Sequence, residues 1–87
     1  MNEKRFLEIM DEDLFDHRNN IKEDQNLLGF QIMAKYTDKV IEGADHDIIY
    51  GPDIDVLIEN GITEDEVRKL NELGFHIYDE SYLATYV

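Results

Sequence analysis

Apolar side chains near the start of the chain recur every three or four residues, which predicts a helix over residues 2–17. The acidic run at residues 11–13 either ends this helix or caps a short one that follows, so its C-terminal end is open. The polar residues 18–25 then predict a loop. The side chains that share the apolar face of this helix are Phe6, Ile9, Met10 and Leu14.

A second apolar run occupies residues 27–36. Within it Leu28, Ile32 and Tyr36 have the spacing of one helix face, which predicts a deeply buried helix. Gly29 opposes this prediction, because glycine in a helix interior costs up to about 1 kcal/mol relative to alanine. A strand is the alternative, since apolar runs of this length do not separate helix from strand by periodicity alone.

Glycine and proline divide residues 43–61 into two short apolar runs. Residues 46–50 predict a strand. Residues 51–53 (Gly-Pro-Asp) predict a turn, because proline fixes its own φ and keeps the preceding residue out of the helical region. Residues 54–58 form either a short strand or a single helical turn, which the Asn-Gly pair at 60–61 ends.

Residues 63–66 (Thr-Glu-Asp-Glu) have the pattern of a capping box at the start of a helix. In such a box the Thr63 hydroxyl accepts a hydrogen bond from the Glu66 amide, and the Glu66 carboxylate accepts one from the Thr63 amide. Ile62 before the cap and Val67 inside the helix add a hydrophobic staple. The local sequence therefore fixes where this helix begins.

The same helix is predicted to end at Gly74, which adopts the left-handed conformation while Phe75 folds back onto Leu70. Residues 75–78 and 83–87 then alternate apolar and polar positions, which predicts a C-terminal β-hairpin. Three tyrosines are expected to be half-exposed on this hairpin. They are Tyr78, Tyr82 and Tyr86.

Together these elements predict one α+β domain over residues 1–87. We expect two to three helices packed on a small, mainly antiparallel sheet that ends in the C-terminal β-hairpin. A chain of 87 residues has room for a single hydrophobic core. Because it contains no Cys, its stability must come from packing.

Several segments are similar to known sequences. Residues 34–39 (AKYTDK), residues 45–50 (DHDIIY), and residues 62–74 with the terminal hairpin resemble small acidic proteins of bacteriophages, prophages and other mobile elements. Those proteins are mostly uncharacterised. The resemblance covers about two-thirds of the chain, residues 28–87, and rests on core and capping residues. It implies a mobile-element origin rather than an activity, and it offers no catalytic residue to carry over.

Acidic residues outnumber basic ones by 21 to 8, which gives a net charge of −13. Beyond Lys39 only Arg68 and Lys69 are basic, against twelve acidic residues. Such a surface repels nucleic acid and anionic membranes, so we expect neither as a direct partner, and it attracts basic proteins. No run approaches the ~20 apolar residues of a membrane span, and the charged N-terminus lacks a signal-peptide core. We therefore expect a cytoplasmic protein, in the host cytoplasm if the chain is phage-encoded.

Residues suited to catalysis or metal binding are sparse. Residues 45–47 (Asp-His-Asp) lack metal-ligand spacing, because on a strand the histidine points away from both carboxylates, and only His17 and His76 could complete the site. Residues 45–59 have the acid density of a calcium loop, but Ile49 occupies a ligand position. There is no Cys and only one Ser, and no set of nucleophile and base is apparent. We predict no enzyme activity, no metal site and no cofactor.

We expect a non-enzymatic acidic binding protein that engages a basic protein surface. In the sharper form of this hypothesis it is a phage-type inhibitor whose carboxylates imitate the phosphates of nucleic acid. One alternative is a small self-associating structural or accessory protein that buries the tyrosine hairpin against a second copy, with residues 83–87 free to pair edge to edge, so that the chain is a monomer or a homodimer. A small enzyme is the third hypothesis. The acidic residues are also explained if they only keep the domain soluble. The candidate contact residues are Glu42, Asp45, Asp47, Asp53, Asp55, Glu59, Glu64, Asp65, Asp79 and Glu80, with Tyr78 and Tyr82.

Overall fold

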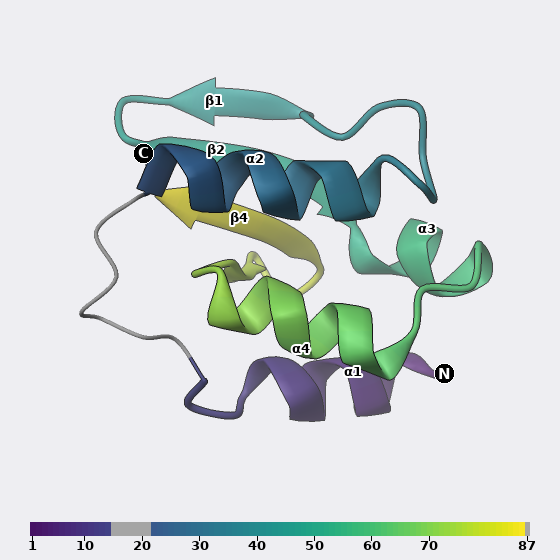
Figure 1. Cartoon of the computed structure of the whole chain (residues 1–87). Coiled ribbons are helices and arrows are strands. Elements are labelled where there is room, and N and C mark those ends of the chain that lie inside the picture. The colour runs from purple at the N-terminus through teal and green to yellow at the C-terminus, as the bar shows by residue number, and fades with distance from the viewer. Residues whose placement is uncertain (15–21, 87) are drawn as a thin grey trace.

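The computed structural model describes residues 1–14 and 22–86. Within these ranges four helices and a four-stranded antiparallel sheet form one α+β fold, as the apolar pattern predicts (Figure 1). In chain order the elements are α1 (Glu3–Met10), α2 (Lys22–Met33), β1 (Gly43–Asp45), β2 (Ile48–Asp53), α3 (Ile54–Glu59), α4 (Glu64–Glu72), β3 (His76–Tyr78) and β4 (Tyr82–Tyr86).

The sheet consists of two hairpins joined side by side. Its strand order is β1-β2-β4-β3, and each neighbouring pair is antiparallel. β4 therefore lies inside the sheet, between β2 and β3, and the edges are β1 and β3. The expectation that residues 83–87 offer a free edge is wrong for Leu83 and Ala84, because β3 pairs with residues 82–84 on the side away from β2, while Thr85 and Tyr86 pair with β2.

Helices cover one face of this sheet. α4 contacts both α2 and α1, and α1 reaches β3 (Figure 1). Between the helices and the sheet lies one hydrophobic core, because each element buries the apolar face that its sequence presents. The core side chains are Phe6, Ile9, Met33, Ile54, Leu57, Ile62, Val67, Leu70, Leu73, Phe75 and Leu83.

Both predicted ends of α4 are confirmed. The Glu66 amide donates to the Thr63 hydroxyl at 3.2 Å, and the Thr63 amide donates to the Glu66 carboxylate at 3.1 Å. At the other end Gly74 has φ 95°, and the Phe75 amide donates to the Leu70 carbonyl at 3.0 Å. These bonds link residues close in sequence, which is why the pattern alone predicts them.

α1 is shorter than the predicted helix over residues 2–17. It ends at Met10, so the acidic run ends the helix, and Leu14 lies beyond it. The cause is a tertiary contact: the buried Asn71 side chain donates to the Ile9 carbonyl at 2.9 Å and to the Glu12 carbonyl at 2.7 Å. The Ile9 carbonyl also accepts from the Glu12 amide at 3.1 Å, so Asn71 gives it a second donor and gives the Glu12 carbonyl a donor beyond the helix end. Residues 15–17 lie outside the described ranges.

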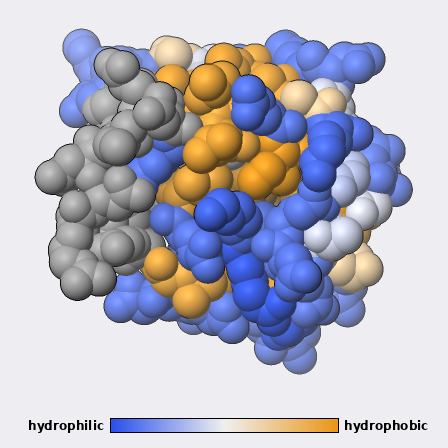
Figure 2. Space-filling view, viewed as in Figure 1, coloured by the Kyte–Doolittle hydropathy of each residue, from blue (hydrophilic) through white to orange (hydrophobic). Residues whose placement is uncertain are grey.

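α2 begins at Lys22, so the loop predicted over residues 18–25 is wrong for residues 22–25, while 18–21 lie outside the described ranges. The helical interpretation of the apolar run is confirmed as far as Met33, after which the chain turns. Its predicted buried face is confirmed only in part, because Ile32 and Tyr36 pack half-buried against the core but Leu28 does not. Leu28 is 48% exposed and Leu27 57% exposed, and apolar side chains gather on the surface over α2 (Figure 2).

Gly29 explains which face of α2 is buried. A Cβ atom at this position would lie 2.0 Å from a ring carbon of Phe75, so only glycine lets the helix approach that ring. The Phe30 ring meets the same ring edge-on, with centroids 5.3 Å apart. Because Gly29 and Met33 turn inward, Leu27 and Leu28 turn outward.

Residues 43–53 form a hairpin that the sequence pattern only partly predicts. The predicted strand at 46–50 starts at Ile48, because His46 and Asp47 make the turn from β1, with φ 35° at His46. Residues 51–53 are not a turn. β2 runs through them with a bulge between Tyr50 and Asp53, where Pro52, which has no N–H, costs no ladder bond.

The open alternative at residues 54–58 is settled as helix. α3 spans Ile54–Glu59, and Asn60 follows as its C-terminal cap. Asp53 caps its start, since its carboxylate accepts from the Asp55 amide at 2.9 Å.

Candidate functional site

The sheet face away from the helices carries four of the five tyrosines. Along β4, Leu83 and Thr85 point to the helix side, so the residues alternating with them point outward. Directly opposed residues share a face, so the strand register extends this set across β2 and β3. We call the set the tyrosine face. Its members are Ile48, Tyr50, His76, Tyr78, Tyr82, Ala84 and Tyr86.

The rings of the tyrosine face pack against one another. Tyr50 and Tyr78 lie 4.9 Å apart between ring centroids, and His76 stacks on Tyr86 at 4.9 Å with an interplanar angle of 20°. The central Ala84 is fully buried. The predicted half-exposure of the hairpin tyrosines is confirmed, with Tyr78 at 45%, Tyr82 at 38% and Tyr86 at 58%. The face is thus an ordered aromatic surface with hydroxyl tips.

The tyrosine face contains no Asp, Glu, Lys or Arg. Burial and the neighbouring Tyr78 hydroxyl raise the pKa of Tyr50, so its hydroxyl keeps its proton. Burial lowers the pKa of His76, against a hydrogen bond with the Gly74 backbone, so its ring is neutral at pH 7. Charge on this side of the molecule therefore comes from the residues around the face.

A hollow of about 300 Å³ opens at one end of the tyrosine face. Two backbone features bring carboxylates to it: the Glu42 amide donates to the Tyr50 carbonyl at 2.8 Å, and Asp79 takes φ 52° in the turn after β3. Rings and carboxylates from both hairpins therefore share one cavity. It is lined by Glu42, Gly43, Tyr50, Tyr78, Asp79 and Tyr82.

Four predicted contact residues meet in this hollow, namely Glu42, Tyr78, Asp79 and Tyr82. Asp45 lies on the same side by register, because it opposes Ile48. Together Glu42, Asp45 and Asp79 are called the acidic rim below.

The other predicted contact residues have different positions. Asp53 opposes Tyr82 but caps α3, so part of its hydrogen-bonding capacity is used. Asp55 and Glu59 belong to α3, while Asp47 and Glu80 lie in the turns after β1 and β3.

The last two predicted acids, Glu64 and Asp65, belong to α4. Glu64 pairs with Arg5 at 2.9 Å and with Arg68 at 3.6 Å, so it ties α1 to α4. Asp65 pairs with Arg68 at 3.4 Å on the exposed helix surface. The cations of α1 and α4 thus neutralise acids on the helix side of the molecule. The acidic rim has Lys39, which pairs with Glu42 at 3.3 Å in an exposed contact of small energetic weight.

The sequence prediction missed Tyr50, Gly43 and β1 as parts of the site. The sequence feature that could have predicted β1 is the pair His46-Asp47. These two residues separate two short extended segments, and two residues are the length of a tight hairpin turn. It is a weak signal, because neither residue is the glycine that such turns prefer.

Within residues 1–14 and 22–86 no three His, Asp or Glu side chains gather in a way that could hold a metal ion. Over the same ranges no helix is both long and apolar enough to cross a membrane.

Fold and site together define an α+β protein with an open aromatic sheet face and acids around it. Comparison of the chain with protein-family models, with curated proteins and with solved structures finds no match. Its function therefore has to be argued from its own geometry.

Proposed function

We propose that this chain is a non-enzymatic binding protein whose tyrosine face and acidic rim engage a basic surface of another protein. The observation that carries the proposal is the hollow in which Tyr50, Tyr78 and Tyr82 lie beside the carboxylates of Glu42 and Asp79. A Lys or Arg side chain in it gains a cation–π contact with a ring and an ion pair with a carboxylate.

The rest of the surface supports a protein partner. Tyrosine is enriched at protein interfaces, because a ring buries a large area at small entropic cost while its hydroxyl keeps a hydrogen bond. The net charge of −13 adds long-range attraction, which speeds encounter with a basic partner and weakens with salt.

In its sharper form the proposal names a nucleic-acid-binding partner. Such proteins present basic clefts, and an acidic protein that occupies one blocks access for nucleic acid. A phage-type inhibitor acting in the host cytoplasm would have this property, which agrees with the resemblance to mobile-element proteins.

The proposal is tested by affinity capture from a bacterial lysate, with washes at about 0.05 M and about 0.5 M NaCl. We expect a basic protein that high salt releases, whose binding to nucleic acid the purified chain then inhibits. The double variant Glu42→Gln/Asp79→Asn should weaken this complex at least about tenfold. Asn suits the positive φ of Asp79, so the turn is kept.

The control is Asp65→Asn/Glu72→Gln, which removes the same charge from α4. It should leave the affinity within about twofold. Equal losses in both double variants would show that only net charge matters and would reject the tyrosine face as the site.

Self-association is the second candidate function, and the exposure of Tyr78, Tyr82 and Tyr86 favours it. Two copies that stack their tyrosine faces would bury these rings, but each copy would bring its acidic rim close to the other. Sedimentation at two salt concentrations separates the candidates. A dimer at both concentrations supports self-association, and a monomer rejects it and leaves the basic partner standing.

A further inference from the structure

α1 lies next to an edge strand of the sheet. α2, α4 and α1 follow one another in the helix layer (Figure 1). α1 also contacts β3, which is one of the two edge strands.

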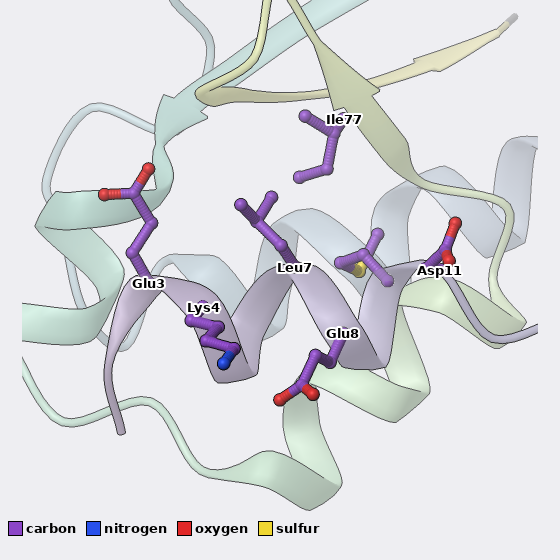
Figure 3. A pocket seen from close by; sticks show the side chains of 7 residues that line it. Glu3, Lys4, Leu7, Glu8, Asp11 and Ile77 are labelled. Atoms are coloured by element: carbon purple, nitrogen blue, oxygen red, sulfur yellow. The ribbon is translucent and has the colours of Figure 1, made fainter.

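A groove of about 910 Å³ lies between α1 and β3. Figure 3 shows Leu7 on the helix side of this groove and Ile77 on the strand side. Both side chains, and that of Met10, are only half-buried, although they pack against the core. The groove thus has an apolar floor of the kind that another strand would cover.

The outer edge of β3 borders this groove. In the described part of the chain β3 pairs with β4 alone. Its sequence, His76-Ile77-Tyr78, contains no Lys, Asp, Glu or Pro, the residues that usually guard an open edge against pairing. A fifth strand could therefore pair with the outer edge of β3 and cover the groove.

We propose that an extended segment of a basic partner adds to β3 as this fifth strand. Its alternate side chains would then lie in the α1 groove beside Ile77 and on the tyrosine face beside His76 and Tyr78. The predicted recognition pattern is apolar residues alternating with basic ones. Only the partner's basic character rests on the proposed function; the strand edge and the groove are separate observations.

The charge around the groove favours a basic segment over a second copy of this chain. Among the residues that the structure describes, the groove is bordered by the acids Glu3, Glu8 and Asp11 and by one cation, Lys4. A second copy of this chain would bring the same acids to the groove, which disfavours β3–β3 pairing between copies. A basic segment meets opposite charge along the same path.

The first test uses a nine-residue peptide of alternating Lys and Val, with a peptide of equal composition but block order as control. Two further versions carry N-methyl groups on the odd or on the even residues, since a strand donates to its neighbour from every second amide. We expect the alternating peptide to bind at least about tenfold more tightly than the block peptide, and only one methylated version to bind. Hydrogen exchange at residues 76–78 should slow on binding.

A protein variant checks the groove. Leu7→Gln should weaken the alternating peptide about five- to tenfold, because it makes the floor polar. Leu27→Gln changes the same residue type on exposed α2 and should leave binding unchanged. Thermal unfolding of both variants confirms that they fold.

Different failures have different meanings. If peptides bind but both methylated versions bind equally, and residues 76–78 gain no protection, strand addition is wrong while capture at the tyrosine face stands. Protection of β3 that grows with protein concentration in the absence of peptide would assign the edge to a second copy and overturn the inference. Absence of binding by the alternating peptide at low salt also overturns it, whatever the lysate capture shows.

Discussion

At the scale of single residues, Glu66 links α4 to the turn after α2. Its carboxylate accepts hydrogen bonds from the Lys35 ammonium, the Tyr36 hydroxyl and the Thr63 amide, and its side chain is 16% exposed. Burial alone would raise its pKa, but the bonds from Lys35, Tyr36 and Thr63 outweigh burial and hold the pKa at about 2.

This pKa predicts how stability depends on pH. The pKa of Glu66 in the folded state lies below its ordinary value of 4.5, so its stabilising effect is present above pH 4.5 and is lost as pH falls toward 2. Glu66→Gln should lower the free energy of unfolding at pH 7 by on the order of 3 kcal/mol, and the difference from the parent should vanish near pH 2. Urea unfolding across this pH range measures it.

The control for this prediction is Asp65→Asn, in the same helical turn but exposed. It should change stability by well under 1 kcal/mol at every pH. A pH-independent loss in Glu66→Gln would show that its side chain acts through shape rather than charge.

Gly29 gives a second prediction at this scale. Alanine favours helices by about 1 kcal/mol over glycine, so propensity alone predicts that Gly29→Ala stabilises the protein. We expect destabilisation by on the order of 2 kcal/mol instead, because the new methyl group would overlap the buried Phe75 ring. Gly43→Ala is the control, since its Cβ atom would meet Tyr50 at an ordinary 3.7 Å. Chemical denaturation of both variants decides between propensity and packing.

At the scale of elements, the end of α1 depends on Asn71 in α4. Asn71→Ala should cost on the order of 2–3 kcal/mol, because it removes two hydrogen bonds that the buried Asn71 side chain donates to the carbonyls of Ile9 and Glu12. Amide exchange should also become faster in the last turn of α1. The control Asn60→Ala removes an exposed bond to the Tyr36 carbonyl and should cost about 1 kcal/mol or less. Equal costs would contradict the assigned role of burial.

Elements differ in how far the sequence predicts them, and α4 and α2 show why. The ends of α4 depend on Thr63, Glu66 and Gly74, whose bonds reach residues three to five positions away. The buried face of α2 depends on Phe75, more than forty residues further along the chain. No periodicity within α2 contains that contact, so the predicted helix is confirmed while its predicted buried face is wrong at Leu28.

At the scale of the whole molecule, the net charge of −13 opposes compaction. Raising NaCl from about 0.01 M to about 0.3 M shortens the screening length from about 30 Å to below 10 Å. We expect the melting temperature to rise by several degrees, because relief of repulsion exceeds the weakening of exposed ion pairs such as Lys69–Glu72. A melting temperature that stays constant or falls in a thermal scan would contradict this prediction.

The site also belongs to the whole molecule, because it forms only when the two hairpins join. Glu42 and Tyr50 come from the first hairpin, while Tyr78, Asp79 and Tyr82 come from the second. The sequence placed most of these residues among its candidates by residue type and charge, yet it spread the candidates over α3 and α4 as well. Pairing of β2 with β4 is what selects among them.

By itself the sequence determined the α+β class, the limits of α4, the C-terminal hairpin and the excess of acid, since these follow from composition and from contacts within a few residues. The tertiary structure decided where α1 ends, which face α2 buries, that β4 lies inside the sheet, and which rings and carboxylates meet in one hollow. The physical reason is common to all four: each depends on a contact between segments far apart in the chain, and local patterns do not encode such contacts.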